Sequence, residues 1–287
     1  MRTRFISFLS LALFLAISYT PLTAQGLEIG IKAGGALYSG DLSPGDLGLY
    51  FEDLNFAGGA YLRYRPTARF GIRVNGNFGR LSAEREMVAL NENVERVPIE
   101  RNFRTKLTEF NAVLEYDLFY LGDRDRNFLA PYAYAGIGVL SFNPESQIDG
   151  VYTELQPLRT EGQGLDPTRY DATPYELTKT IFVFGGGVRV RFAERIVLGL
   201  ELGGRNTFTD YIDDISNTRV NYLDVISGPG GTLAGQFSNP AVTNPSEVTD
   251  LEYDRGGEFN DFYFVGGFTL GITIGEGGSN KSGCYKF

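Results

Sequence analysis

The 287-residue sequence contains no histidine and no tryptophan, and its single cysteine is Cys284. One cysteine cannot form a disulfide within the chain. Without histidine, no imidazole can serve as a catalytic base, which excludes the familiar histidine-dependent proteases, lipases and acyltransferases. The Gly-x-Ser-x-Gly turn of serine hydrolases is also missing. We therefore expect no enzymatic activity and no catalytic residue.

Two further motifs are weak candidates for ligand binding. The three glycines at 185–187 lie inside an alternating apolar segment, without the Lys-Ser pair and the helix that a phosphate loop needs. The acidic stretch 210–214 offers the oxygen ligands that calcium prefers, but it lacks the spacing of an EF-hand loop. We interpret the glycines as close strand packing and the acidic stretch as a solvated loop or strand extension. No cofactor and no metal is expected.

Positive charge and long apolar runs are also scarce. The chain has 26 Lys and Arg against 35 Asp and Glu, a formal net charge of −9, which argues against nucleic acid as a partner. After residue 24 no stretch approaches the roughly 18 uninterrupted apolar residues of a transmembrane helix. Glycine (37), phenylalanine (22) and tyrosine (17) are instead abundant. This composition is typical of a membrane β-barrel, which needs aromatic girdles and uncrowded strands.

The first residues have the order of a secretory signal peptide. Arg2 and Arg4 precede an apolar run at 5–16, and small residues lead up to Ala24. This order predicts cleavage after Ala24 and export of the remainder. The expected division is a signal peptide at 1–24, a barrel at 25–274 and a tail at 275–287.

Alternating apolar and polar residues indicate β-strands. In the stretch 261–274, Phe264, Phe268 and Ile272 share one face, and Tyr263 and Thr269 share the other. Such a strand is long enough to cross a bilayer, which takes about 10 tilted residues. Seven more segments alternate, so we predict an all-β fold, an eight-stranded antiparallel transmembrane β-barrel. The alternative is a soluble β-sandwich. The expected strands are 27–36, 56–65, 70–81, 104–119, 131–142, 180–192, 195–204 and 261–274.

The lengths of the connections favour the barrel. Long connections at 37–55, 82–103, 143–178 and 206–260 alternate with short ones. Bacterial outer-membrane barrels have short periplasmic turns and long extracellular loops, whereas a sandwich has no reason to sort its loops in this way. We therefore expect an integral outer-membrane protein in contact with outer-membrane lipids.

The polar faces of the strands would line the lumen. Eight strands leave an interior just wide enough for side chains, and ionisable groups buried there must be paired. We predict a plugged barrel with a lumen charge network of Arg63, Arg73, Glu109, Glu115, Arg189, Glu201 and Arg205.

Three stretches are distinctive: Gly40-Asp41-Leu42, Phe142-Asn143-Pro144 together with 155–164, and 205–216. They resemble the PorG family of outer-membrane proteins from Bacteroidota. The likeness covers most of the chain after residue 24. The distinctive residues of the two long motifs are Leu155, Gln156, Pro157, Glu161, Gly162, Gly164, Phe208, Thr209, Asp210, Tyr211, Asp213 and Asp214.

The resemblance implies an OmpA-like eight-stranded barrel associated with the type IX secretion system and, in many species, with gliding motility. It implies an anchoring role in contact with the periplasmic ring proteins PorK and PorN, and it carries over no catalytic residue. The alternatives are a stand-alone surface barrel whose loops bind a ligand or envelope partner, and a small-solute pore. In the tail, Cys284, Tyr285, Lys286 and Phe287 are candidates for a periplasmic contact.

Overall fold

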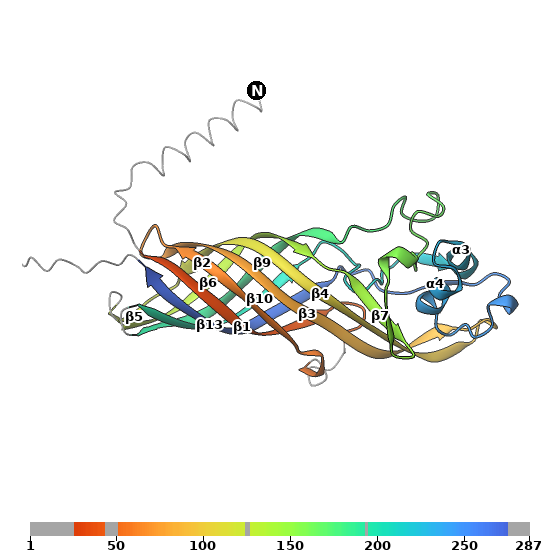
Figure 1. Cartoon of the computed structure of the whole chain (residues 1–287), viewed down its shortest axis with the longest axis horizontal. Helices are drawn as coiled ribbons and strands as arrows, with labels where there is room; N and C mark the ends of the chain where they lie inside the picture. The colour runs from red at the N-terminus through yellow and green to blue at the C-terminus, as the bar shows by residue number, and fades with distance from the viewer. Residues whose placement is uncertain (1–25, 44–50, 124–126, 193–194, 275–287) are drawn as a thin grey trace, which may run out of the picture.

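Eight long strands form a closed antiparallel ring. The computed structural model describes residues 26–43, 51–123, 127–192 and 195–274. β1 pairs with both β2 and β13, and the pairing of β4 with β6 closes the ring (Figure 1). The predicted eight-stranded barrel is therefore confirmed. In ring order the strands are β1 (Leu27–Ser39), β2 (Asn55–Tyr64), β3 (Phe70–Leu90), β4 (Arg96–Asp117), β6 (Asn127–Ser141), β9 (Thr178–Phe192), β10 (Ile196–Asn206) and β13 (Phe262–Ile274).

Alternate residues of each strand point outward and inward. On β13, Phe268 and Ile272 are exposed by 72% and 53%, whereas Thr269 and Thr273 between and beside them are buried. The same alternation runs along β10, where Leu198, Leu200 and Leu202 are exposed. The outer wall is thus an apolar band. On β3 and β4 the band ends where Phe78 and Phe110 give way to Arg80 and Lys106.

Two strands are longer than the sequence indicates. The segment 82–103 was expected to be a charged connection, but β3 continues to Leu90 and β4 starts at Arg96. That expectation was wrong because the alternation reverses beyond the band: most outward residues are charged or polar, while the hydrogen-bonded ladder continues. Many of the inward residues are apolar, such as Leu81 and Phe103, and Arg101 is also buried there.

The interior is narrow, and tyrosine rings lie directly over glycines. In β6 tyrosines alternate with alanines, so the sequence does not indicate which face is inward, and the structure places Tyr132 and Tyr134 inside. A Cβ atom added to Gly203 would lie 2.1 Å from Tyr134 Oη, and one added to Gly271 would lie 2.5 Å from Tyr61 Oη. These two glycines therefore give the tyrosines their space.

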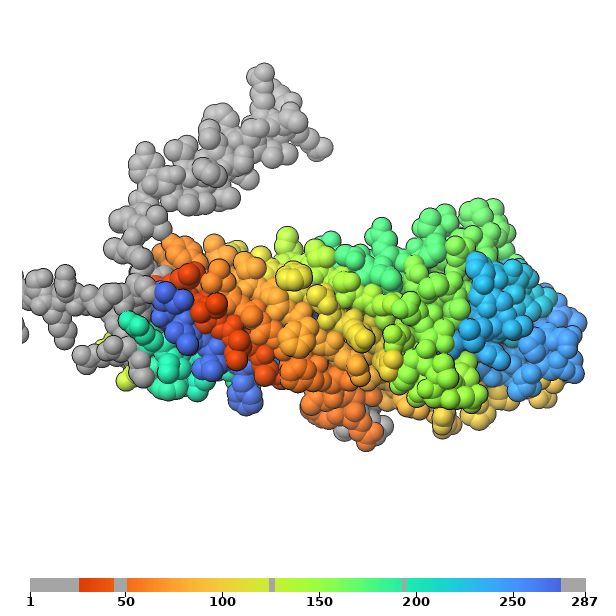
Figure 2. Space-filling model, viewed as in Figure 1, coloured from red at the N-terminus to blue at the C-terminus, as the bar shows by residue number. Residues whose placement is uncertain are grey.

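The long connections fold over one end of the barrel, which we call the loop end. Residues 143–177 and 207–260 make up the cap (Figure 2). The cap contains β7 (Pro144–Ile148), β8 (Val151–Glu154), η2 (Gln156–Leu158), β11 (Arg219–Asn221), α3 (Tyr222–Ser227), α4 (Gly231–Ser238), η3 (Pro245–Glu247) and β12 (Glu252–Asp254). Before β2 lies η1 (Phe51–Asp53), and β5 (Leu121–Asp123) lies at the opposite end, the turn end.

The cap has an apolar core of its own. The side chain of Asn221 accepts a hydrogen bond from Leu223 N at 3.0 Å and so starts α3. The core is formed by Val220, Tyr222, Val225, Ala234, Val242, Val248, Leu251 and Tyr253. No helix among the described residues combines the length and apolar character that crossing a membrane requires. The predicted signal peptide and the tail with Cys284 lie outside the described residues.

Replacing Gly203 with alanine tests the tyrosine–glycine packing. We expect Gly203→Ala to lower the free energy of unfolding by about 1–3 kcal/mol, because the added methyl overlaps Tyr134 Oη and would lie 2.8 Å from the carbonyl oxygen of Phe184. Adding Tyr134→Phe should restore part of the loss. Gly76→Ala is the matched control, since its Cβ would meet only a Phe110 ring atom, at 3.3 Å. Urea unfolding measures all four proteins; equal losses for Gly203→Ala and Gly76→Ala would contradict the packing argument.

Candidate functional site: the sealed lumen and the cap

The seven lumen residues expected from the sequence are buried inside the barrel. At the centre is Glu115, whose two carboxylate oxygens bind three arginines. Arg63 Nε lies 2.7 Å from Oε2, Arg73 Nε lies 2.8 Å from Oε1, and Arg189 Nη1 lies 2.9 Å from Oε2. A buried carboxylate keeps its charge at low cost only with such partners.

The other predicted acids continue the network along the lumen. Glu201 Oε2 lies 2.6 Å from Arg73 Nη1 and accepts a hydrogen bond from Tyr132 Oη at 2.9 Å. Nearer the loop end, Glu109 Oε2 pairs with Arg205 Nε at 3.2 Å and accepts from Tyr263 Oη at 2.6 Å. The lumen is thus filled by paired charges and tyrosines.

Sequence reasoning missed four members of this network. Glu28 pairs with Arg63 and Arg65, Lys32 Nζ lies 2.9 Å from Glu201 Oε1, and Asp117 pairs with Arg189. Each of the four lies on the same inward face as the predicted residues. The period-two alternation therefore indicates that these four side chains point inward, but only the strand register shows which charges meet across the lumen.

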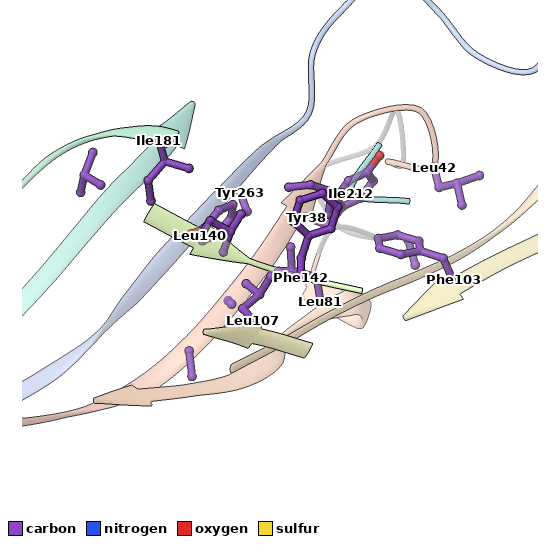
Figure 3. Close-up of a cluster of buried hydrophobic side chains, with 14 of the residues drawn as sticks. Tyr38, Leu42, Leu81, Phe103, Leu107, Leu140, Phe142, Ile181, Ile212 and Tyr263 are labelled. Atoms are coloured by element: carbon purple, nitrogen blue, oxygen red, sulfur yellow. The ribbon is translucent and has the colours of Figure 1, made fainter. Parts of the chain in front are cut away.

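A layer of buried, mostly apolar side chains lies at the mouth of the barrel (Figure 3). Residues after β10 turn inward, so that Ile212 and Ile215 are buried against strand residues such as Tyr38, Leu81 and Phe103. Tyr38 and Phe103 pack edge-on, with ring centroids 4.7 Å apart. We call this layer the mouth cluster. It separates the lumen network from the cap.

Two carboxyl groups share one phenol in the mouth cluster. Tyr38 Oη lies 2.7 Å from both Asp213 Oδ2 and Asp261 Oδ1. A phenol donates only one hydrogen, so one carboxyl group must supply the second proton. Burial raises the pKa of both aspartates well above its usual range, and for Asp213 the charge of Asp261 adds to the effect.

Arg255 joins the two motif segments of the cap. Its Nη1 donates to Thr160 Oγ1 and to the carbonyl of Asp214, both at 2.7 Å, and lies 3.3 Å from Glu161 Oε1. Ser216 N donates to Glu161 Oε1 at 2.8 Å. We call these groups the Arg255 junction. Burial raises the pKa of Glu161 to about 7 in spite of the arginine. The sequence offered no sign of Arg255, which stands alone in a long connection.

The remaining motif residues surround this junction. Leu155, Thr209 and Asp213 are buried; the Gln156 amide donates to the carbonyl of Tyr175 at 3.1 Å; and Pro157 lies in η2. Gly162 and Gly164 adopt positive φ, 76° and 75°, which glycine allows. Phe208 also has a positive φ, 52°, and is exposed, whereas Asp210 and Tyr211 border an open cavity.

The two buried aspartates of the second motif segment are already bonded to other side chains of the chain that the structure describes. The carboxylate of Asp214 is bonded to Thr160, Tyr175 and Arg255, and the carboxylate of Asp213 accepts a hydrogen bond from Tyr38. Among the described residues no group of three or more His, Cys, Asp or Glu is placed to hold a metal ion. The buried acids therefore serve to join segments.

The comparisons with known proteins give one family. The family described as "Domain of unknown function (DUF6089)" matches residues 7–228. No curated protein matches in sequence. Three similar solved structures are OprG from Pseudomonas aeruginosa, Neisserial surface protein A and the outer membrane protease OmpT from Escherichia coli. Their sequence identities to this chain are 11%, 12% and 7%, and their TM-scores are 0.40, 0.39 and 0.37. The matches cover 88%, 88% and 90% of this chain and 98%, 97% and 100% of the other chain. Scores this low add nothing to the fold that the strand pairing establishes.

The pKa shifts predict a cap that is more stable in acid. In the folded protein the pKa values of Asp213, Asp261 and Glu161 are raised, so the folded cap binds more protons than the unfolded chain. Its stability should fall as the pH rises from about 4 through 7. Hydrogen exchange at 207–216, corrected for intrinsic rates, measures this. Asp213→Asn should flatten the dependence; an unchanged slope in that variant would contradict the assignment.

Removing Arg255 should open the cap and leave the barrel intact. Arg255→Met leaves Glu161 and Asp214 buried without their cation, a loss of about 3–5 kcal/mol for a broken buried pair. The matched control is Arg219→Met, because Arg219 is exposed and solvent screens its bond to Glu252. Protease digestion should cut the cap of the first variant alone. Equal resistance of both variants would show that Arg255 does not hold the cap.

Proposed function

The chain belongs to the DUF6089 family, and we propose that it is an integral outer-membrane β-barrel with a non-enzymatic anchoring or structural role in type IX protein secretion and gliding motility. The observation that carries the proposal is the closed ring with an apolar outer wall and a filled lumen. In such a ring every strand has a partner on both edges, as a bilayer demands.

The height of the apolar wall suits a membrane. On β3 the outward residues from Phe70 to Phe78 are apolar, and Arg80 follows. A tilted strand needs about 9–11 residues to cross a bilayer. Outer-membrane lipids are therefore the first partner. By the usual asymmetry of loop length, the cap lies outside the cell and the turn end faces the periplasm. The signal-like sequence at 1–24 supports export.

The filled lumen argues for a structural role over a small-solute pore. Glu115, Arg63 and Arg73 meet at the centre of the lumen at ion-pair distances, and the mouth cluster closes the loop end above them. A conducting pore needs a continuous water path, as the wider barrels have. A rigid plugged cylinder is suited to anchoring other proteins.

The type IX assignment rests on the family resemblance. The motif segments around Glu161 and Asp213 resemble those of the PorG family, and they pack around the Arg255 junction and the mouth cluster. The proposed partners are the periplasmic ring proteins PorK and PorN. The short turns lie on the side that such partners would reach, and β13 ends on that side before the tail with Cys284, Tyr285, Lys286 and Phe287 follows in the sequence.

The second candidate function is a stand-alone surface barrel whose loops bind a ligand or an envelope partner. It is favoured by the cap, which has its own apolar core and an open cavity. Normal export of type IX cargo after deletion of the gene would favour this candidate over the first.

A charge on the outer wall tests the membrane assignment. Leu200 is exposed in the middle of β10, and Leu200→Arg should cost about 2–4 kcal/mol if lipid surrounds it. Glu84→Arg places the same side chain on β3 beyond the apolar band and should change stability by less than about 0.5 kcal/mol. Unfolding from lipid vesicles measures both. Equal effects would mean that the wall does not meet lipid.

The single cysteine tests the partners directly. A photocrosslinker attached to Cys284 in intact cells should capture PorK or PorN. The control is Cys284→Ser with Phe259→Cys, because Phe259 is exposed by 85% in the cap and faces away from the periplasm in the proposed orientation. Capture from both positions, or from neither, would contradict the proposed contact.

A further inference from the structure

The cap contains an open polar cavity that the barrel function does not use. Its volume is about 610 Å³. Three separate stretches surround it: residues 171–179, which lead into β9, residues 208–218, which follow β10, and residues 258–260, which precede β13. The cavity therefore lies where the second motif segment leaves the barrel wall and where the chain returns to the wall at β9, on the side of the protein away from the turn end.

A stacked tyrosine pair forms part of its wall. The rings of Tyr175 and Tyr211 are nearly parallel, with centroids 4.5 Å apart and an interplanar angle of 8°. Tyr175 is buried, whereas Tyr211 is half-buried and lines the cavity. Phe208 adds an exposed ring on the same wall. Flat aromatic faces of this kind pack against the C–H faces of ring-shaped ligands.

The rest of the lining is made of hydrogen-bonding groups. Asn217, Asn260 and Thr218 provide amides and a hydroxyl, and Asp171, Glu176, Asp210 and Glu258 provide carboxylates. Lys179 is the one basic residue among the described lining residues. Oδ1 of Asp210 is buried and has no hydrogen-bond partner within the described chain. The acidic excess disfavours anionic ligands, and the polar lining disfavours a lipid tail.

The site is held in place before any ligand arrives. Tyr175 Oη donates to Asp214 Oδ1 at 2.7 Å, which ties the tyrosine pair to the Arg255 junction. Tyr211 Oη accepts from Ser216 Oγ at 3.3 Å, and Asp171 O accepts from Gly164 N at 2.6 Å. A preformed wall loses little conformational entropy on binding.

We propose that this cavity binds a neutral or amino-bearing oligosaccharide, with a sugar ring stacked on Tyr211 and hydroxyl or amino groups bonded to Asp210 and the asparagines. Aromatic faces beside carboxylates and amides match the two surfaces of a sugar, apolar C–H and polar O–H. The proposal is independent of the type IX role, which gene deletion tests separately.

Binding is tested with the full-length barrel in a detergent without a sugar headgroup, so that the detergent does not compete. The probes are maltohexaose, xylohexaose, chitohexaose and its deacetylated form, each up to about 10 mM, the range of weak sugar binding. Saturation-transfer NMR and calorimetry report affinity. At least one probe should bind. Tyr211→Ala should weaken that binding at least tenfold, and the matched control Tyr152→Ala, an exposed cap tyrosine outside the cavity, should change it by less than about twofold.

Asp210→Asn keeps the shape of the side chain and guards against loss of folding in Tyr211→Ala. It should weaken binding at least about fivefold, because an amide replaces one acceptor by a donor. The proposal is overturned if no probe binds the wild-type protein, if Tyr152→Ala weakens binding as much as Tyr211→Ala, or if Asp210→Asn binds normally. Binding of a protein ligand at this cavity, with no binding of any sugar probe, would also overturn it.

Discussion

The rest of the structure depends on the pairing of charges inside a narrow closed ring. Eight strands with an apolar outer wall leave the polar half of each strand facing a space that side chains fill completely. Glu115 meets this constraint with three arginines, and Glu201 and Glu109 each meet it with at least one cation and a tyrosine hydroxyl. Removing one partner would leave a buried charge uncompensated, so the lumen behaves as one unit.

The same physical solution is repeated above the mouth. Arg255 holds Glu161 and Asp214 as the lumen arginines hold Glu115, and it joins segments that lie far apart in the sequence. Asp213 and Asp261 are different, because no cation among the described residues lies within ion-pair distance of them. A proton on one of the two carboxyl groups removes the charge instead. The barrel is therefore sealed twice, by charge pairs in the lumen and by the apolar mouth cluster. The cap is fastened to that seal, which gives its cavity a rigid wall.

These features fit a protein that binds its partners through its outer surfaces. Side chains fill the lumen and its mouth, and the buried acids of the cap are hydrogen-bonded to neighbouring segments. What remains accessible is the apolar wall, the cap cavity and the short turns. In our proposal the wall meets lipid, the cavity binds a sugar and the turn end contacts periplasmic partners.

The sequence alone determined the local pattern: period-two alternation specified eight strands, the inward and outward faces of all of them except β6, and the sorting of long and short connections. Alternation also placed Arg63 and Glu115 on inward faces, because side chains of a strand must point to opposite sides. Only the tertiary structure decided the pairing, because register sets which charges meet. It also decided the length of β3 and β4, whose ends beyond the apolar band carry charged outward residues and do not look like membrane strands in the sequence. The contact of Arg255 with Glu161 and Asp214 was likewise decided by the tertiary structure. Contacts between distant segments have no period, so no local pattern contains them.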